Sequence, residues 1–267
     1  MKAWEDLTIA DDYMFKLVMS HKRICKRLLE TLLSIKIRDL KEPETEKAMK
    51  YGYEGKGIRL DVYVEDDLNT VYDIEMQIRH YSDEMLGKRT RYYQSTIDFG
   101  ALESGVTYDK LKKSIIIFIC PFQLFNSNRH IYTFQNTCQE DKSILLEDGA
   151  SKIFLSTKGK IDDVSPQIKH FLDFVDGLSV QDEFVDEIKE LMNKLKITER
   201  EKANYMTFQM KIDEEREEAK NETLFSVVKA LVQKEGWSFE KAFDVLGVSP
   251  ENRGLFLKNM QKTTLMN

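Results

Sequence analysis

Two carboxylates and an amide stand close together in one short stretch of the sequence. Residues 57–79, reading GIRLDVYVEDDLNTVYDIEMQIR, predict two β-strands, 58–65 and 70–79, joined by a polar turn. Because side chains alternate across a strand, Asp61 lies on one polar face, and Glu75 and Gln77 lie on another. If the strands pair as a hairpin, Asp61 and Glu75 stand side by side, with Gln77 about 6–7 Å further along.

This pairing has an electrostatic consequence. Two carboxylates on a mostly apolar hairpin cost free energy unless something positive lies between them. Carboxylate oxygens are the ligands that Mg²⁺ and similar hard cations prefer. We therefore expect Asp61 and Glu75 to face a bound divalent cation, whereas Asp73, on the same face as Glu75, is expected to reach solvent.

Helices on either side of the hairpin must position these groups. Residues 8–20 predict a first helix with Thr8 as N-cap and Asp12 in the first turn, where its charge favours the helix dipole. Residues 23–35 predict a second helix, which carries Glu30 inside an apolar run. One interpretation of Glu30 is a boundary position that points to water.

A long basic helix is predicted directly after the hairpin, over residues 79–104, and a buried strand follows at 114–120. Four apolar residues of the helix are expected to face inward, namely Met85, Tyr92, Ile97 and Leu102. Four cations at its start are candidates for phosphate contacts, namely Arg79, Lys88, Arg89 and Arg91. The alternative interpretation of these cations is an ordinary solvated helix face.

The whole chain is predicted to divide into three parts. The first domain covers residues 1–196 and includes further strands at 129–134 and 152–156 and helices at 165–176 and 182–195. A charge-dense helical linker covers 197–221, and a small helical tail covers 222–267. The charged residues of the linker are predicted to form either a solvated helix face or a helix for self-association. The tail is similar to a helix-turn-helix but lacks a basic recognition helix, so a packing or oligomerisation role is favoured.

Composition narrows the class of protein. Of 267 residues, 42% are hydrophobic and 32% are charged, which is typical of a soluble globular protein. The most apolar run, SIIIFIC at 114–120, is too short for a membrane span, and the N-terminus lacks the apolar core of a signal peptide. The three cysteines form no CxxC, so neither a disulfide framework nor a zinc ribbon is expected. We expect a cytoplasmic protein without membrane attachment. The net charge of −6 disfavours a passive, charge-driven nucleic-acid binder.

The order of elements and the Asp…Glu-x-Gln spacing resemble the PD-(D/E)XK nuclease superfamily. Eight segments in order are similar to its Rpn family of recombination-promoting nucleases and transposases. They are DDYMFK (11–16), RLLETLLSIKI (27–37), RLDVYVED (59–66), YDIEMQ (72–77), KRTRYYQSTID (88–98), IIFICPF (116–122), IYTFQNTCQED (131–141) and LLEDGASKIFLSTKG (145–159). The resemblance runs from about residue 5 to 200. It implies an α/β restriction-endonuclease-like core, a mixed β-sheet flanked by helices, with a helical C-terminal extension.

The resemblance also implies roles for particular residues. Asp61 and Glu75 would hold Mg²⁺, for which Mn²⁺ can substitute, and Glu30 would complete the metal site through water. Gln77 stands where the superfamily usually has a lysine. An amide can orient a water by hydrogen bonds but carries neither a proton for transfer nor a charge, so turnover should be modest. No organic cofactor is implied.

The leading hypothesis is a metal-dependent DNA endonuclease with low sequence specificity that acts in recombination or on mobile elements. The alternative is a catalytically weak or inactive nuclease fold that serves as a DNA-binding or interaction module. A third hypothesis, cleavage of RNA, is left open by the sequence. Cutting both strands of a duplex commonly needs two active sites, so a homodimer through residues 197–221 is a further expectation.

Overall fold

The computed structural model describes residues 2–50, 57–102, 105–250 and 253–254 of the chain. The chain forms two compact units, Lys2–Glu201 and a C-terminal unit that begins at Lys202. The first unit contains the β-sheet and the candidate site. Each unit is described by itself below.

The first unit is built on a mixed six-stranded sheet with the strand order β1-β2-β3-β4-β6-β5. The pairs β3–β4 and β4–β6 are parallel, and the other three pairs are antiparallel. The strands are β1 Glu44–Met49, β2 Ile58–Glu65, β3 Val71–Met76, β4 Ser114–Cys120, β5 Ile131–Phe134 and β6 Ala150–Ser156. The parallel strands lie at the centre, which explains why SIIIFIC of β4 reads as a continuous apolar run.

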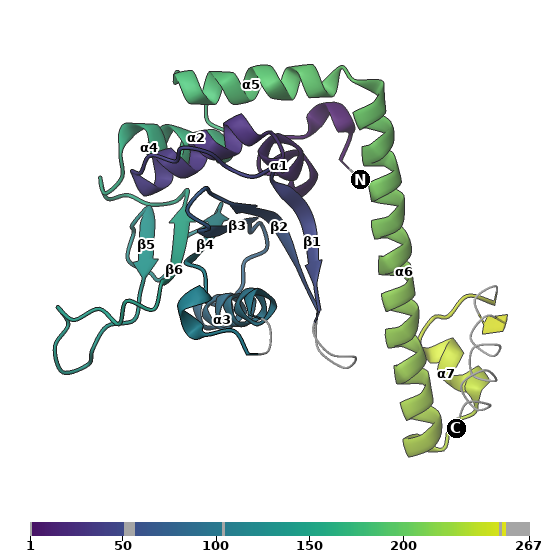
Figure 1. The fold of residues 1–267 in the computed structure, drawn as a ribbon. Helices are drawn as coiled ribbons and strands as arrows, with labels where there is room; N and C mark the ends of the chain where they lie inside the picture. Colours follow the sequence, from purple (N-terminus) through teal and green to yellow (C-terminus); the bar gives the residue numbers. More distant parts are fainter. Residues whose placement is uncertain (1, 51–56, 103–104, 251–252, 255–267) are drawn as a thin grey trace. The chain divides into compact units, whose positions relative to one another are not determined.

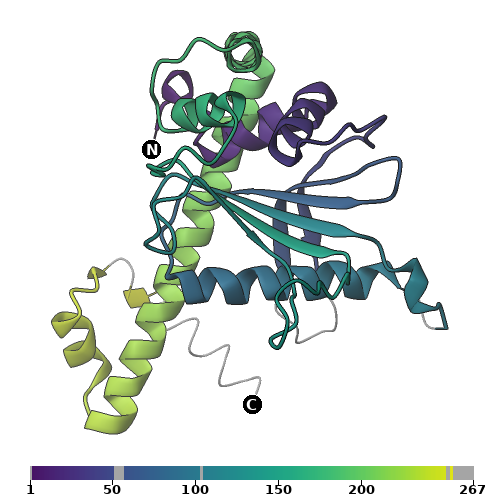
Figure 2. The ribbon, with the colours of Figure 1, turned by 90° about the vertical axis from the view of Figure 1, so that its left-hand side faces the viewer.

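Helices cover both faces of this sheet (Figures 1 and 2). One face carries α1 Asp12–Met19, α2 Lys22–Leu33, α4 Pro166–Val175 and α5 Glu183–Lys196, and the other carries α3 Asp83–Ala101. Ser82, Ser165 and Asp182 cap α3, α4 and α5 by accepting backbone N–H bonds. The α/β restriction-endonuclease-like fold implied by the sequence is therefore confirmed.

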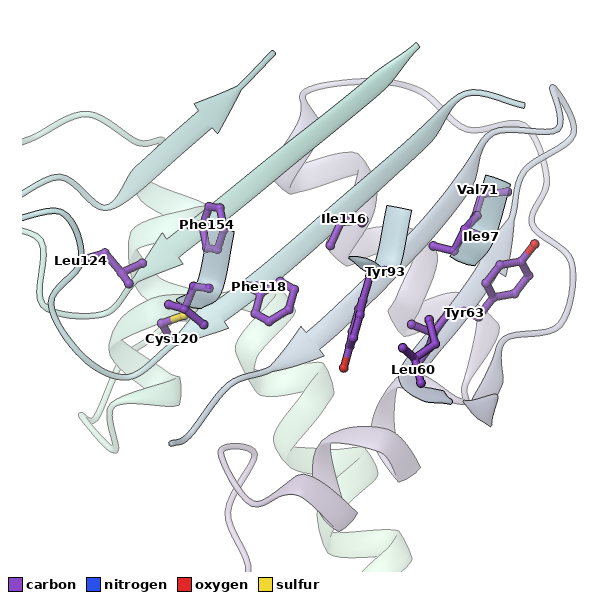
Figure 3. Packing of buried hydrophobic residues seen from close by; sticks show 12 residues of the cluster. Leu60, Tyr63, Val71, Tyr93, Ile97, Ile116, Phe118, Cys120, Leu124 and Phe154 are labelled. Carbon is purple, nitrogen blue, oxygen red and sulfur yellow. The ribbon is translucent and has the colours of Figure 1, made fainter. Parts of the chain in front are cut away.

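The core under α3 fixes how that helix lies on the sheet. Tyr93 and Ile97 of α3 pack with Ile116 and Phe118 of β4 and with Phe154 of β6 (Figure 3). The rings of Tyr93 and Phe118 lie 6.2 Å apart between their centroids. This packing brings the inner face of α3 directly over β3 and β4.

Some sequence-based placements are wrong. Helix α1 begins at Asp12 with Asp11 as its N-cap residue, and Thr8, predicted to be the cap, instead donates to the Asp11 carboxylate. On α3, Met85 and Tyr92 are exposed, whereas Leu86 and Tyr93 are buried. The prediction is confirmed for Ile97 and is wrong by one residue at Met85 and Tyr92, because helical periodicity alone does not distinguish two adjacent stripes when both carry apolar residues.

Two expected boundaries involve residues outside the described part of the chain. The polar connection before the hairpin, residues 36–56, predicts a first strand near residues 49–53. The observed β1 ends at Met49, and residues 51–53 lie outside the described residues. The helix predicted over 79–104 is observed from Asp83 to Ala101, and residues 103–104 also lie outside them.

The C-terminal unit is helical. Helix α6, Glu199–Glu235, begins in the first unit and continues without a break past residue 221, where a separate tail was predicted to begin. Helix α7, Phe239–Val245, packs on it through a small core of Val228, Ala242, Phe243 and Val248. The three-part domain division stays a prediction. Within the described residues, every helix is too short or too polar to cross a membrane.

The packing of the sheet against the helices above it can be tested at β6. Leu155 is fully buried there, whereas Leu68, in the turn between β2 and β3, is 81% exposed. Leu155→Ala should lower the free energy of unfolding by about 2–5 kcal/mol, because it leaves a cavity in the core. Leu68→Ala should change it by less than about 0.5 kcal/mol. Urea denaturation followed by circular dichroism measures both, and equal effects would contradict the placement of β6.

Candidate active site

The candidate site lies where β2 and β3 stop pairing. The antiparallel ladder between them ends at the pair Val62 and Ile74. Beyond it, side chains replace the backbone partners: the Asp61 N–H donates to Glu75 Oε1 at 2.8 Å, and the Met76 N–H donates to Asp61 Oδ2 at 3.1 Å. The two carboxylates therefore stand side by side, as the hairpin pattern predicts, and each is held by the opposite strand.

The regular alternation of β2 fails at this point. Leu60 and Tyr63 are three residues apart, yet both belong to the core beneath α3 (Figure 3). Strict alternation would place them on opposite faces. The strand therefore turns about its axis near Asp61, which explains why the Asp61 carboxylate is accessible to groups from both sides of the sheet.

Arg89 of α3 reaches the site from one face. Its Nη2 lies 2.9 Å from Glu75 Oε2, and its Nη1 donates to Gln77 Oε1. The Tyr93 hydroxyl accepts from Arg89 Nε at 2.9 Å, and the guanidinium lies over the Phe118 ring at 5.2 Å from the centroid. Arg89 was predicted to contact DNA from an exposed helix face. The structure instead places it inside the site as the partner of Glu75 and Gln77, because α3 turns this residue toward the sheet.

Gln77 is held at both ends of its amide. Its Oε1 accepts from Arg89, and its Nε2 donates to the Arg79 carbonyl. The side chain is buried. In this arrangement the amide that was predicted to orient a water is already engaged with protein partners.

Lys16 of α1 reaches the site from the opposite face. Its Nζ lies 2.6 Å from Asp12 Oδ2, 2.8 Å from Glu46 Oε1 and 4.0 Å from Asp61 Oδ1. The residue is only 6% exposed. Sequence reasoning singled out neither Lys16 nor Glu46. The available signal was a lysine four residues after Asp12 within the apolar run DYMFKLVM, where an unpaired charge would be costly.

Asp73 lies in the interior of the protein. Its exposure is 0%, and no N–H or hydroxyl group of the described residues donates to either carboxylate oxygen. The side chain with which it can share a hydrogen bond is the neighbouring carboxyl of Glu75. The prediction that Asp73 reaches solvent is therefore wrong. The reason is that α3 covers this face of β3, whereas a sequence pattern shows only that residues share a face and not what covers it.

Burial raises the pKa of all three strand carboxyls. Desolvation, and then the charge of Asp12, raises the pKa of Asp61 to about 6, although Lys16 and Arg89 oppose the shift. Desolvation, and then the charge of Asp61, raises the pKa of Glu75 to about 8. Desolvation and the Glu75 charge raise the pKa of Asp73 well above its usual range. The neighbouring cations thus do not fully offset the cost of ionising these carboxyls in a buried site.

The donor set suits a hard divalent cation. Asp61 and Glu75 offer oxygen ligands that the opposite strand fixes in place, and a cation beside them would relieve the like-charge repulsion between them. The described residues contain no group of three His, Cys, Asp or Glu side chains arranged to hold a metal. A site with two protein carboxylates fits Mg²⁺, which usually keeps several waters and takes further ligands from substrate phosphates.

Other predicted residues lie elsewhere. Glu30 on α2 accepts from the Ile37 N–H at 2.9 Å, and no described contact joins it to Asp61 or Glu75, so its part in the site stays a prediction. Arg79 and Arg91 are exposed, and exposed Lys88 pairs with Glu84 at 2.5 Å. Contacts of these three cations with phosphate stay predictions as well.

Comparison with known proteins gives one match. The model of a family described as PD-(D/E)XK nuclease family transposase matches residues 9–227 of the chain. This range contains the whole sheet, the flanking helices α1 to α5 and every residue of the candidate site. Neither the curated proteins nor the solved structures yielded a match.

The buried carboxyls predict a pH dependence of stability in metal-free buffer. The pKa values of Asp61, about 6, and Glu75, about 8, exceed their ordinary values of 3.8 and 4.5. Between about pH 4 and pH 8 the folded state therefore binds more protons than the unfolded state, and raising the pH favours unfolding. The double variant Asp61→Asn/Glu75→Gln should lose this penalty and gain roughly 1–3 kcal/mol over wild type at pH 8.

Glu65 provides a control, because its pKa is shifted in the opposite direction from those of Asp61 and Glu75. Although burial opposes the shift, hydrogen bonds from Lys112, Lys41 and Tyr63 lower the pKa of Glu65 to about 2. This carboxylate stabilises the fold above its ordinary pKa, so Glu65→Gln should lose stability at neutral pH. Urea denaturation with a chelator present, at steps from pH 4 to pH 8, measures all three proteins. A double variant that follows the wild-type curve would contradict the assigned burial.

Proposed function

Because the chain belongs to the PD-(D/E)XK nuclease family, we propose that it is a metal-dependent DNA endonuclease with low sequence specificity. The observation that carries this proposal is a pair of hydrogen bonds between the two strands: the Asp61 N–H holds the Glu75 carboxylate, and the Met76 N–H holds the Asp61 carboxylate. This arrangement presents two fixed oxygen donors at the end of a hairpin. Mg²⁺ is the proposed cation, and Mn²⁺ is expected to substitute for it.

The proposed reaction is hydrolysis of a phosphodiester. The oxygen of a water attacks phosphorus, one P–O ester bond breaks, and the departing oxygen is protonated. When bound, the divalent cation polarises the scissile phosphate and lowers the pKa of a water. Asp61 and Glu75 are proposed to hold the cation, and Arg89 keeps Glu75 oriented toward it. Burial of the carboxylates in a low-dielectric site strengthens their interaction with the cation.

The same contacts indicate modest turnover. Gln77 carries no charge, and both ends of its amide are engaged by Arg89 and the Arg79 carbonyl. It is therefore poorly placed to activate a water unless these contacts rearrange when DNA binds. Low sequence specificity is proposed because the tail that is similar to a helix-turn-helix lacks a basic recognition helix. A role in recombination or on mobile elements agrees with the description of the family.

A second candidate function is a nuclease fold that binds DNA without efficient cleavage. The observation that favours it is the Arg89 guanidinium, which pairs with Glu75 Oε2 at 2.9 Å and already supplies this carboxylate with a positive charge. Cation binding and cleavage assays distinguish the two candidates. A protein that binds DNA but neither cleaves it nor binds Mg²⁺ or Mn²⁺ would favour this second function.

The endonuclease proposal is tested by removal of the Asp61 charge. Asp61→Asn should lower the rate of plasmid nicking in Mg²⁺ by about 100-fold or more, which corresponds to about 2.7 kcal/mol or more of transition-state stabilisation. The control is Asp67→Asn, in the turn beyond β2, which pairs with Arg38 instead. It should nick plasmid at the wild-type rate. Nicking by Asp61→Asn at the wild-type rate would overturn the proposal.

DNA contacts of the exposed cations are tested by the salt dependence of binding. In an Asp61→Asn background, where cleavage is slowed, Arg79→Ala and Arg91→Ala should each weaken binding for all sequences alike. Each should also reduce the slope of log K against log salt by about 0.9, the value for one lost phosphate contact. Arg38→Ala, with a side chain 84% exposed at another surface, serves as the control. Fluorescence anisotropy measures the slopes, and unchanged slopes would remove these residues from the DNA interface.

A further inference from the structure

A buried ammonium group stands behind Asp61. Lys16 comes from α1, on the face of the sheet opposite to α3, and its Nζ contacts Asp12 and Glu46 at 2.6 and 2.8 Å. The third carboxylate near it is that of Asp61, whose Oδ1 lies 4.0 Å away. We propose that Lys16 is a positioning residue of the hydrolysis, which holds Asp61 in place and supplies positive charge to the site that Gln77 does not supply. This proposal rests on the proposed nuclease function.

The first argument is the distribution of cations between the two carboxylates. Glu75 pairs with Arg89 from the α3 face, and Asp61 lies nearest to Lys16 from the α1 face. Among the ion pairs of the described residues, these two are the ones that involve Asp61 and Glu75. Each of the two proposed metal ligands therefore has its own cation, delivered by a different helix.

The second argument is the cost of burying Lys16. A lysine that is 6% exposed loses most of its hydration, and burial alone would favour its neutral form. The carboxylates of Asp12 and Glu46, 2.6 and 2.8 Å from Nζ, offset this cost. These two partners hold the ammonium beside the site, where Asp61 Oδ1 lies 4.0 Å from it.

The third argument is backbone strain at the partner of Lys16. Glu46 has a φ of +55°, although it is not glycine and lies within β1. It falls between the pairs Thr45–Val62 and Lys47–Leu60, which places it opposite Asp61. A left-handed residue inside a strand is strained and persists only where the surroundings hold it in that conformation. Here the strained residue brings its carboxylate to Lys16, beside Asp61.

Loss of the ammonium has a definite consequence. Asp12, Glu46 and Asp61 would then stand together without the ammonium, and like-charge repulsion would displace the Asp61 carboxylate from its present position. DNA binding through the exposed cations of α3 would be unaffected. The expected effect therefore appears in kcat and leaves KM largely unchanged.

The experiment compares the full-length wild type with Lys16→Met, Lys16→Arg and the control Lys22→Met in plasmid nicking at saturating Mg²⁺. Lys22 is the first residue of α2 and forms a similar ion pair, 2.8 Å from Nζ to Asp39 Oδ1, outside the site. Lys16→Met should lower kcat about 10–100-fold per folded molecule, the range found for residues that orient metal ligands. KM should change less than about threefold, Lys16→Arg should recover part of kcat, and Lys22→Met should match the wild type.

Thermal unfolding and circular dichroism give the folded fraction of each variant. If Lys16→Met does not fold, the charge-balanced variant Lys16→Met/Glu46→Gln replaces it, with the same expected loss of kcat. The proposal is overturned by a folded variant that retains the wild-type kcat, by an effect confined to KM, or by an equal loss in Lys16→Arg. A wild type that cleaves no DNA in Mg²⁺ or Mn²⁺ would instead refute the nuclease function, and the role of Lys16 with it.

Discussion

The site depends on two hydrogen bonds between neighbouring strands, from the Asp61 N–H to the Glu75 carboxylate and from the Met76 N–H to the Asp61 carboxylate. Where β2 and β3 cease to pair, backbone N–H groups that would otherwise lack partners donate to the two carboxylates. The same hydrogen bonds that terminate the hairpin therefore fix two acids side by side. Burial then makes these acids difficult to ionise, and their environment requires positive charge.

The rest of the first unit supplies that charge from both faces of the sheet. Helix α3, anchored by Tyr93 against Phe118, places Arg89 on Glu75. Helix α1 places Lys16 within a group of three carboxylates that includes Asp61. The two helices belong to opposite layers, and they meet the same pair of residues because β2 turns about its axis at this point. The two carboxylates therefore receive their cations from opposite layers of the fold.

Family membership and geometry agree on the type of chemistry, and the geometry adds where the positive charge of the site comes from. The family indicates a nuclease, and the fixed carboxylates suit a divalent cation. The geometry adds that the neutral Gln77 is engaged by Arg89 and that the nearest ammonium comes from α1. A site with its positive charge on neighbouring helices would keep its carboxylates in place before a cation arrives.

The sequence by itself determined the hairpin and the adjacency of Asp61 and Glu75, because a period of two residues and a polar turn are local properties. It also determined the fold class, through eight ordered segments. Only the tertiary structure decided that Asp73 is buried, that Arg89 points inward and that Lys16 and Glu46 stand behind Asp61. The physical reason is that these facts depend on which helix covers which face of the sheet and on its rotation about its own axis. Those properties are set by packing between residues far apart in the chain, which no local pattern records.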